Sequence, residues 1–358
     1  MKLENLGWDE AWAMALASWD RGEWEPARVS FASRERYRVL TEEGELWALL
    51  PGAARLDAAS PMPAVGDWVA LECAEGETNR IRKVLPRRTT LGRAQAGERK
   101  KEQPTAARQQ VMAANVDVAI VVCGLDRDYN PRRIERYLTL AWGGGVEPAI
   151  LLNKADLCFD ADLKAEEVRA LAPATTVETL SALDVAGIDM VRALVPPGRT
   201  ACLLGSSGAG KSTILNGLMG GERQRTAETS ETTGKGRHTT THRELLVIPG
   251  GGVMIDTPGL REVALIAGEE ALSAAFGSIA ELAQRCRFTD CSHTTEPGCA
   301  VLCAVEEGDL DADRLESFHR LGKEIAYHQA VESTSPARVE RDKWKSIKKE
   351  VRRIYKSR

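Results

Sequence analysis

A glycine-rich stretch in the second half of the chain has the residue types and spacing needed to bind phosphate. It runs Gly205-Ser206-Ser207-Gly208-Ala209-Gly210-Lys211-Ser212 and fits the pattern G-x-x-x-x-G-K-[ST]. The glycines let backbone N–H groups turn onto phosphate oxygens, Lys211 adds positive charge at the β- and γ-phosphates, and the Ser212 hydroxyl can ligate Mg²⁺. An apolar run precedes the stretch and a helical pattern follows it, and this strand–loop–helix setting disfavours a chance match. The N-terminus of the helix would add positive potential at the phosphates. The stretch predicts a nucleotide site in which Thr213 also takes part and Lys211 also acts in catalysis.

A second motif identifies the base that this site would bind. Asn153-Lys154-Ala155-Asp156 fits N-K-x-D and follows the apolar run Ala149–Leu152. The Asp156 carboxylate can accept hydrogen bonds from both N1–H and the exocyclic amine of guanine, whereas adenine offers no such pair. Asn153 would brace the loop and the base, and Ser181-Ala182 fits the short S-A element whose backbone N–H faces the guanine O6. The pattern predicts guanine and excludes an ATP-using kinase or transporter subunit.

A third motif would hold the metal ion that accompanies the nucleotide. Asp256-Thr257-Pro258-Gly259 fits D-x-x-G directly after the apolar run Val253–Ile255. Asp256 can hold Mg²⁺ through water, and the Gly259 N–H can sense the γ-phosphate. GTP or GDP with Mg²⁺ is therefore the predicted ligand.

Residues for hydrolysis are predicted from the stretch Arg237–His242, which lies between the phosphate loop and D-x-x-G. A switch loop with a Mg²⁺-ligating threonine belongs there; Thr240 is the predicted ligand and Thr239 the alternative. Many GTPases place a water-orienting Gln directly after D-x-x-G, but this chain has Leu260. Hydrolysis should therefore be slow without a further group. His238 is the best internal candidate, since imidazole can hydrogen-bond water near neutral pH; the alternative is that His238 packs in the loop or contacts RNA.

The order of the motifs is unusual. Ordinary GTPases run phosphate loop, switch threonine, D-x-x-G, N-K-x-D and S-A, whereas here N-K-x-D and S-A come before the phosphate loop. The set is complete but rotated, and such a rotation can preserve a fold because domain termini often lie close together. As a consequence, the segment after Asp256 leads straight into the C-terminal region. We expect a nucleotide-driven shift to be transmitted along it.

A cluster of metal-ligating residues lies in the C-terminal region. Cys286-x4-Cys291-x-His293-x5-Cys299 offers three thiolates and one imidazole. In a reduced compartment, such a set suits one Zn²⁺ ion in tetrahedral coordination. With all four coordination positions filled by protein, the ion would be structural. Cys303 is the alternative fourth ligand, and unliganded residues in a loop are the alternative to a metal site. Asp290 or Glu296 could support the ligands.

The elements that would position these residues predict a multidomain α/β protein. Short alternating strands predict a small β-barrel, and alternating strands and helices predict a parallel-rich sheet with helices on both faces. Helical patterns then follow, among them Glu269–Cys286. The predicted division is an N-terminal extension at 1–25, an OB-fold at 26–92, a linker at 93–108, a circularly permuted GTPase domain at 109–264, and a zinc-binding helical domain with a basic tail at 265–358.

Composition narrows the class of protein further. The chain has 358 residues, a hydrophobic fraction of 43% and a net charge of −4. It has no apolar run long enough for a membrane span and no basic start before an apolar run, so we expect a cytoplasmic protein without a signal peptide. Basic residues gather in Arg80–Lys101 and Lys343–Arg358. These stretches can contact phosphates of a nucleic acid, and the alternative for each is a solvated surface.

These features together resemble one family over nearly the whole chain, the small ribosomal subunit biogenesis GTPases called RsgA or YjeQ. Its most specific segments are Gly236–Thr241, Asp256–Glu262 and Cys286–Val301. The resemblance implies an N-terminal OB-fold, a permuted GTPase domain and a zinc domain whose ligands are Cys286, Cys291, His293 and Cys299. It further implies binding to the small (30S) ribosomal subunit and its 16S rRNA late in maturation, with GTP hydrolysis stimulated by the subunit. We expect the protein to be a monomer.

Two functions are compatible with these observations. The first is a GTPase that acts as a timing switch on the small subunit. The second is an rRNA-binding module that uses GTP as a structural ligand, which Leu260 leaves open. Lys211, Ser212, Thr240 and Asp256 favour the first, because a structural pocket would not need γ-phosphate sensors.

Overall fold

The computed structural model describes residues 1–19, 23–33, 36–51, 61–73, 78–94, 109–220, 243–256 and 267–333. The chain divides into two compact units. One contains Met1–Leu91 and Val111–Glu262, and the other contains Gly92–Gln110 and Val263–Arg358. None of the helices described is both long and apolar enough to cross a bilayer. The predicted linker at 93–108 and the basic tail lie almost wholly outside the described residues.

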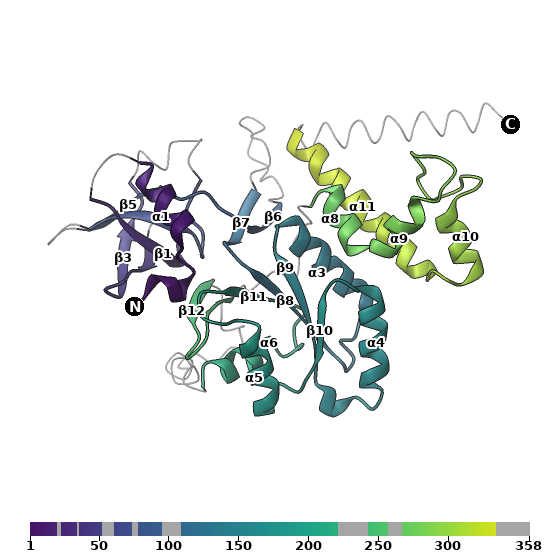
Figure 1. The fold of residues 1–358 in the computed structure, drawn as a ribbon, viewed down its shortest axis with the longest axis horizontal. Coiled ribbons are helices and arrows are strands. Elements are labelled where there is room, and N and C mark those ends of the chain that lie inside the picture. Colours follow the sequence, from purple (N-terminus) through teal and green to yellow (C-terminus); the bar gives the residue numbers. More distant parts are fainter. Residues whose placement is uncertain are drawn as a thin grey trace, which may run out of the picture. The chain divides into compact units, whose positions relative to one another are not determined.

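The N-terminal strands close into a barrel (Figure 1). They are β1 (Glu25–Ala32), β2 (Arg36–Leu40), β3 (Glu45–Leu49), β4 (Trp68–Glu72) and β5 (Asn79–Val84). The pairing order is β1-β2-β3-β5-β4 and back to β1, and only the β3–β5 pair is parallel. Alternate side chains point inward and form an apolar core of Ala27, Val29, Tyr37, Val39, Ala48, Leu50, Val69, Leu71 and Ile81. This confirms the predicted OB-like barrel.

A mostly parallel sheet carries the nucleotide motifs. Its strands are β8 (Val118–Gly124), β9 (Glu147–Asn153), β10 (Thr176–Thr179), β11 (Thr200–Leu204), β12 (Glu244–Val247) and β13 (Val253–Asp256). They lie in the order β10-β9-β8-β11-β13-β12, and only β12 is antiparallel to its neighbour. Every residue of β8 and β11 is buried, as expected for strands covered on both faces. The carboxyl ends of the parallel strands therefore meet at one edge, where ligands of open α/β sheets bind.

Helices cover both faces of this sheet (Figure 1). They are α3 (Pro131–Gly143), α4 (Ala161–Leu171), α5 (Val185–Ala193) and α6 (Lys211–Leu218). Apolar residues of α5 and α6 pack in one core with alternate residues of β8, and α3 contacts β8 and β9. The start of α3 follows from its sequence: the Asn130 side chain accepts a hydrogen bond from Arg133 N at 3.1 Å, and proline occupies the first turn.

A buried arginine joins the barrel to the nucleotide-binding sheet. The Arg28 guanidinium donates to the backbone oxygens of Leu6, of Gly66 at 3.3 Å and of Asn115 at 3.0 Å. It also lies 5.4 Å from the centre of the Trp68 ring. Burial lowers the pKa of Arg28 to about 10, so the side chain stays charged at neutral pH. The N-terminal segment, the barrel and the end of β7 (Gln109–Ala114) thus share one polar junction.

The N-terminal segment packs in the first unit. It contains a 3₁₀ turn, η1 (Leu3–Leu6), and helix α1 (Glu10–Ala17). Asp9 caps α1 by accepting from Trp12 N at 3.1 Å, and Arg88 pairs with the same carboxylate at 2.6 Å. The pairing with Arg88 is the largest reason that the pKa of Asp9 lies below its ordinary value.

The sheet and the barrel are also hydrogen-bonded to each other through strands. Strand β12 pairs with β1, so the eleven strands from β10 to β4 form one continuous sheet. The sequence analysis did not predict β12, because its few residues lie beside a Gly- and Thr-rich stretch that masks the strand pattern.

The second unit is helical where it is described, apart from the parts of β6 (Thr90–Ala94) and β7 that it contains, two strands that pair with each other. Its helices are α8 (Glu269–Ala275), α9 (Gly277–Ala283), α10 (Ala300–Glu307) and α11 (Ala312–Ser333). The prediction of one helix over Glu269–Cys286 was wrong. Phe276 leaves the helical conformation, and its ring is fully buried with its centre 5.5 Å from that of Phe318, so packing against α11 outweighs helix continuity.

Candidate functional site

One buried side chain connects the three nucleotide motifs that the sheet brings together. Asn153 ends β9, its side-chain amide donates to the backbone oxygen of Ala209 at 2.8 Å, and its side-chain oxygen accepts from Ala182 N at 2.9 Å. The N-K-x-D loop, the phosphate loop and the S-A element are therefore tied at one point. Asn153 is only 2% exposed, so its amide is satisfied by these partners rather than by water.

The phosphate loop has the backbone that its glycines predict. Gly205, Gly208 and Gly210 all have positive φ, the conformation that glycine adopts without strain. At Gly210 a Cβ would lie 2.0 Å from the Asn153 side-chain nitrogen, so any other residue would displace the brace. The Lys211 ammonium donates to the carbonyl oxygens of Gly205, at 2.8 Å, and of Ser206, which holds it over the loop at the first position of α6.

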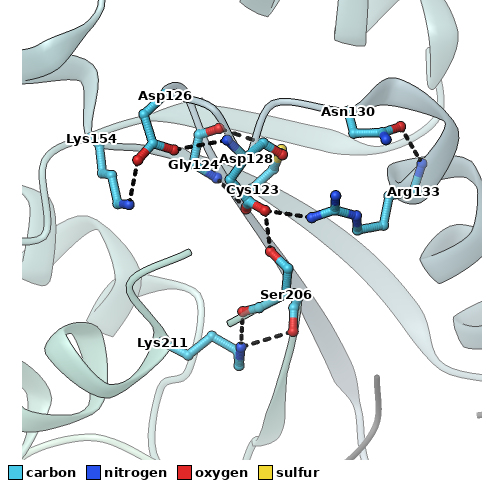
Figure 2. A network of polar contacts seen from close by, with 10 residues as sticks. Cys123, Gly124, Asp126, Asp128, Asn130, Arg133, Lys154, Ser206 and Lys211 are labelled. Carbon is cyan, nitrogen blue, oxygen red and sulfur yellow. Dashed lines mark hydrogen bonds and ion pairs between the residues drawn. The ribbon is translucent and has the colours of Figure 1, made fainter. Parts of the chain in front are cut away.

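Two aspartates that the sequence analysis missed attach a further loop to the site. Figure 2 shows this loop, which follows β8 and faces both nucleotide loops. The Asp128 carboxylate accepts from the Ser206 hydroxyl and pairs with Arg133, and it also accepts from Gly124 N at 3.2 Å. The only sequence indication of these contacts was their place, because the loop follows the carboxyl end of a buried parallel strand.

The other aspartate of this loop reaches the base-binding motif. The Asp126 carboxylate pairs with the Lys154 ammonium at 2.7 Å (Figure 2). This hydrogen bond is the largest reason that the pKa of Asp126 lies below its ordinary value. Lys154 itself has a left-handed backbone, with a φ of 66°, which turns the chain into the loop that carries Asp156. Together, the two aspartates connect the loop after β8 to the phosphate loop and to the base-binding loop.

Several of the residues that would touch a nucleotide directly are exposed. Asp156, Ser207, Gly208, Ser212 and Thr213 are exposed. The others predicted for the site are half-buried or buried: Lys154, Ala155, Ser181, Ala182, Gly205, Ser206, Ala209, Gly210 and Lys211. The buried members hold the loops in shape, and the exposed members leave an accessible carboxylate and hydroxyls at the same sheet edge.

Strand β13 brings Asp256 to this edge as well. It pairs in parallel with β11, whose carboxyl end leads into the phosphate loop, with Cys202 opposite Ile255. Asp256 is half-buried. The other residues predicted for the metal and for hydrolysis, His238, Thr240 and Gly259, lie outside the described residues.

The predicted metal ligands of the second unit converge. The ligand atoms of Cys286, Cys291, His293 and Cys299 all lie within 4.8 Å of one another. The Cys286 and Cys299 sulfurs are 3.9 Å apart, and the His293 Nδ1 lies 3.4 Å from the Cys299 sulfur. In a tetrahedral zinc site with Zn–S bonds of about 2.3 Å, two sulfurs are separated by about 3.8 Å. The spacing thus fits one zinc ion.

The local backbone explains why these four residues meet. His293 has a φ of 56°, and the Glu296 carboxylate accepts from Ser292 N and Thr294 N at 3.0 and 2.9 Å, closing the loop between the ligands. Hydrogen bonding, from the Ser292 hydroxyl first, holds the pKa of Glu296 far below its ordinary value. Cys303, the alternative ligand, is exposed and donates to Glu307 at 3.2 Å, outside the cluster.

Known proteins resemble this chain along nearly its whole length. The RsgA GTPase family model matches residues 84–266. A protein of Opitutus terrae named small ribosomal subunit biogenesis GTPase RsgA is 44% identical over 97% of this chain and 96% of its own length. A protein of the same name in Streptomyces coelicolor is 41% identical over 99% of this chain and 92% of its own. The chain belongs to the RsgA GTPase family.

Solved structures agree with this assignment. The crystal structure of YjeQ from Thermotoga maritima matches 85% of this chain and 99% of its own, with a TM-score of 0.62 and 27% identity. YloQ, described as a circularly permuted GTPase, has the same fold, with a TM-score of 0.60 over 86% of this chain and 97% of its own, at 24% identity. The RsgA-family chain is therefore a GTP hydrolase with a permuted GTPase fold, and guanine nucleotide is the ligand that its family implies.

Proposed function

We propose that this protein binds the small ribosomal subunit through its 16S rRNA, assists late maturation of that subunit as a cytoplasmic monomer, and hydrolyses GTP when the subunit stimulates it. The observation that supports the proposal is the Asn153 tie between the three nucleotide loops, because base and phosphate recognition would then lie at one sheet edge. The names of the relatives supply the ribosomal partner.

Guanine selection would rest on the exposed Asp156. Its carboxylate can accept from N1–H and the exocyclic amine of guanine, and adenine would leave it unpaired. Ala182 N already donates to Asn153. The contact to the guanine O6 that we expect from the S-A element would therefore come from a neighbouring N–H.

Phosphate and magnesium binding would rest on α6 and β13. The loop from Gly205 to Gly210 and the start of α6 would present N–H groups and positive potential to the phosphates. Ser212, Thr240 and Asp256 would hold Mg²⁺, which neutralises charge that develops on the phosphates during transfer. Thr213 would contact the same phosphate group. His238 would orient the attacking water, the task of the Gln that many GTPases have where this chain has Leu260.

The Cys₃His cluster would hold one structural zinc ion. Burial is the largest reason that the pKa of His293 lies below its ordinary value, which favours the neutral imidazole that a metal requires. With all four positions occupied by protein, the ion would have no open site at which to activate water.

Turnover with purified subunits tests the proposal. GTP hydrolysis by the protein should rise strongly when isolated small subunits are added and stay at the basal rate with large subunits. Tight GTP binding without any stimulation would contradict the proposal and favour an rRNA-binding module that uses GTP as a structural ligand. A His238→Ala variant that binds GTP and keeps full stimulated turnover would remove His238 from catalysis.

A further inference from the structure

A row of directly opposed residues runs from Asp256, the proposed Mg²⁺ ligand of the nucleotide site, into the barrel. Asp256 lies opposite Glu244, Glu244 opposite Phe31, Phe31 opposite Arg38, and Arg38 opposite Trp47. Directly opposed side chains lie on the same face of a sheet. One face of the sheet therefore carries an unbroken line of side chains over β13, β12, β1, β2 and β3.

The side chains of this row contact one another. The Arg38 guanidinium reaches across Phe31, 5.6 Å from the ring centre, to pair with the Glu244 carboxylate, and it also pairs with Glu45 at 3.0 Å. The Phe31 and Trp47 rings meet edge to face with centres 6.2 Å apart. The Arg38 and Glu244 side chains are 24% and 32% exposed, so this pair is shielded more than an ordinary surface pair.

The row contains two carboxylates at opposed positions and the positive charge of Arg38. Glu244 and Asp256 are like charges at opposed positions, an arrangement that destabilises a sheet and adds negative potential where an anionic ligand must bind. Arg38, from the barrel, pairs with Glu244 and adds positive charge to this row. Without it, the Glu244 carboxylate would repel both Asp256 and the magnesium complex of GTP, which is itself a net anion.

We propose that the barrel residue Arg38 is a positioning residue for the GTPase site: through Glu244 it sets the charge and position of Asp256. The barrel thereby controls Asp256, the proposed Mg²⁺ ligand. Trp47 lies at the far end of the same row and is half-exposed. This inference rests on the proposed role of Asp256 in holding Mg²⁺.

The test is a charge-removal cycle on the full chain, read out as the Kd of a non-hydrolysable GTP analogue with Mg²⁺. Arg38→Met should weaken binding roughly two- to fivefold, the range for one charged cross-strand pair. Adding Glu244→Gln to Arg38→Met should restore the wild-type Kd, because the residue opposite Asp256 is then neutral. Arg38→Lys, which keeps the charge, should stay near wild type. Arg38→Gln, which removes the charge, takes the place of Arg38→Met if that variant does not fold and should weaken binding in the same way.

A matched control uses another cross-strand pair of the barrel, Arg82 and Glu72, whose charged atoms lie 2.5 Å apart on strands that do not pair with β12. Arg82→Met should leave the Kd unchanged. An unchanged Kd in Arg38→Met, or a double variant weaker than Arg38→Met alone, would overturn the inference. An Asp256→Asn variant that keeps the Mg²⁺ dependence of the wild type would instead refute the proposed role of Asp256, whatever the cycle shows.

Discussion

The nucleotide site and the Cys₃His cluster are built in opposite ways. The nucleotide site takes its residues from loops far apart in sequence, which meet because the parallel strands β8, β9, β11 and β13 end at one sheet edge. The cluster takes all its ligands from one short stretch, Cys286–Cys299, held by a turn at His293. A site defined by strand ends can survive a change in chain order, whereas a loop with four metal-ligating residues would depend on a bound ion.

The largest expected effect separates the two sites. Cys286→Ser should abolish zinc binding and unfold the loop around α10, because structural zinc contributes on the order of 10 kcal/mol to folds of this kind. Zinc content and circular dichroism measure the loss, and GDP affinity should change little. Cys303→Ser is the matched control, since that thiol lies outside the cluster, and it should retain zinc. A Cys286→Ser variant with full zinc content would contradict the ligand assignment.

Lys211→Ala should have the complementary effect. Removing the ammonium from the phosphate loop should lower GTP turnover by roughly 10²- to 10³-fold, as for other groups that stabilise transition-state charge. Zinc content should be unchanged. Turnover is measured with small subunits present, and activity within a few-fold of wild type would place phosphate recognition elsewhere.

Asp156→Asn should change which base is bound. An amide can donate where the carboxylate accepts, so GTP affinity should fall by about 100-fold while xanthosine triphosphate gains affinity. Competition binding measures both. Asp160→Asn, an exposed aspartate in the same loop region that pairs with Lys164 at 3.1 Å, is the matched control and should keep the preference for guanine.

Asp128→Asn should give a smaller effect than these three changes, because it loosens the phosphate loop without touching the nucleotide. Losing the carboxylate partner of Ser206 and Arg133 should weaken GDP binding by about three- to tenfold, the cost of one or two charge-assisted hydrogen bonds. A calorimetric titration measures it. Unchanged affinity would show that the loop after β8 does not brace the site.

The motifs of the nucleotide site were predictable because each is local. Asp156 and Lys211 each sit in a short pattern whose residue types are set by the chemistry of guanine and phosphate. The barrel was predictable from strand periodicity, and its inward residues, such as Val39 and Ile81, alternate as expected.

The contacts between elements were not predictable in the same way. Asp128 lies in no motif, and its pairing with Ser206 depends on how two loops approach in space. Strand β12 is short, and its pairing with β1 depends on where the barrel docks. The break at Phe276 follows from long-range packing against Phe318, which helical periodicity cannot reveal.

The most direct test of the account is whether the three loops tied by Asn153 form one guanine site. The purified chain is titrated with GDP and with ADP in the presence of Mg²⁺, and heat or fluorescence reports binding. We predict that GDP binds about 1,000-fold more tightly than ADP, because only guanine satisfies Asp156. Equal affinities for the two nucleotides would contradict the assembly of base and phosphate recognition at this sheet edge.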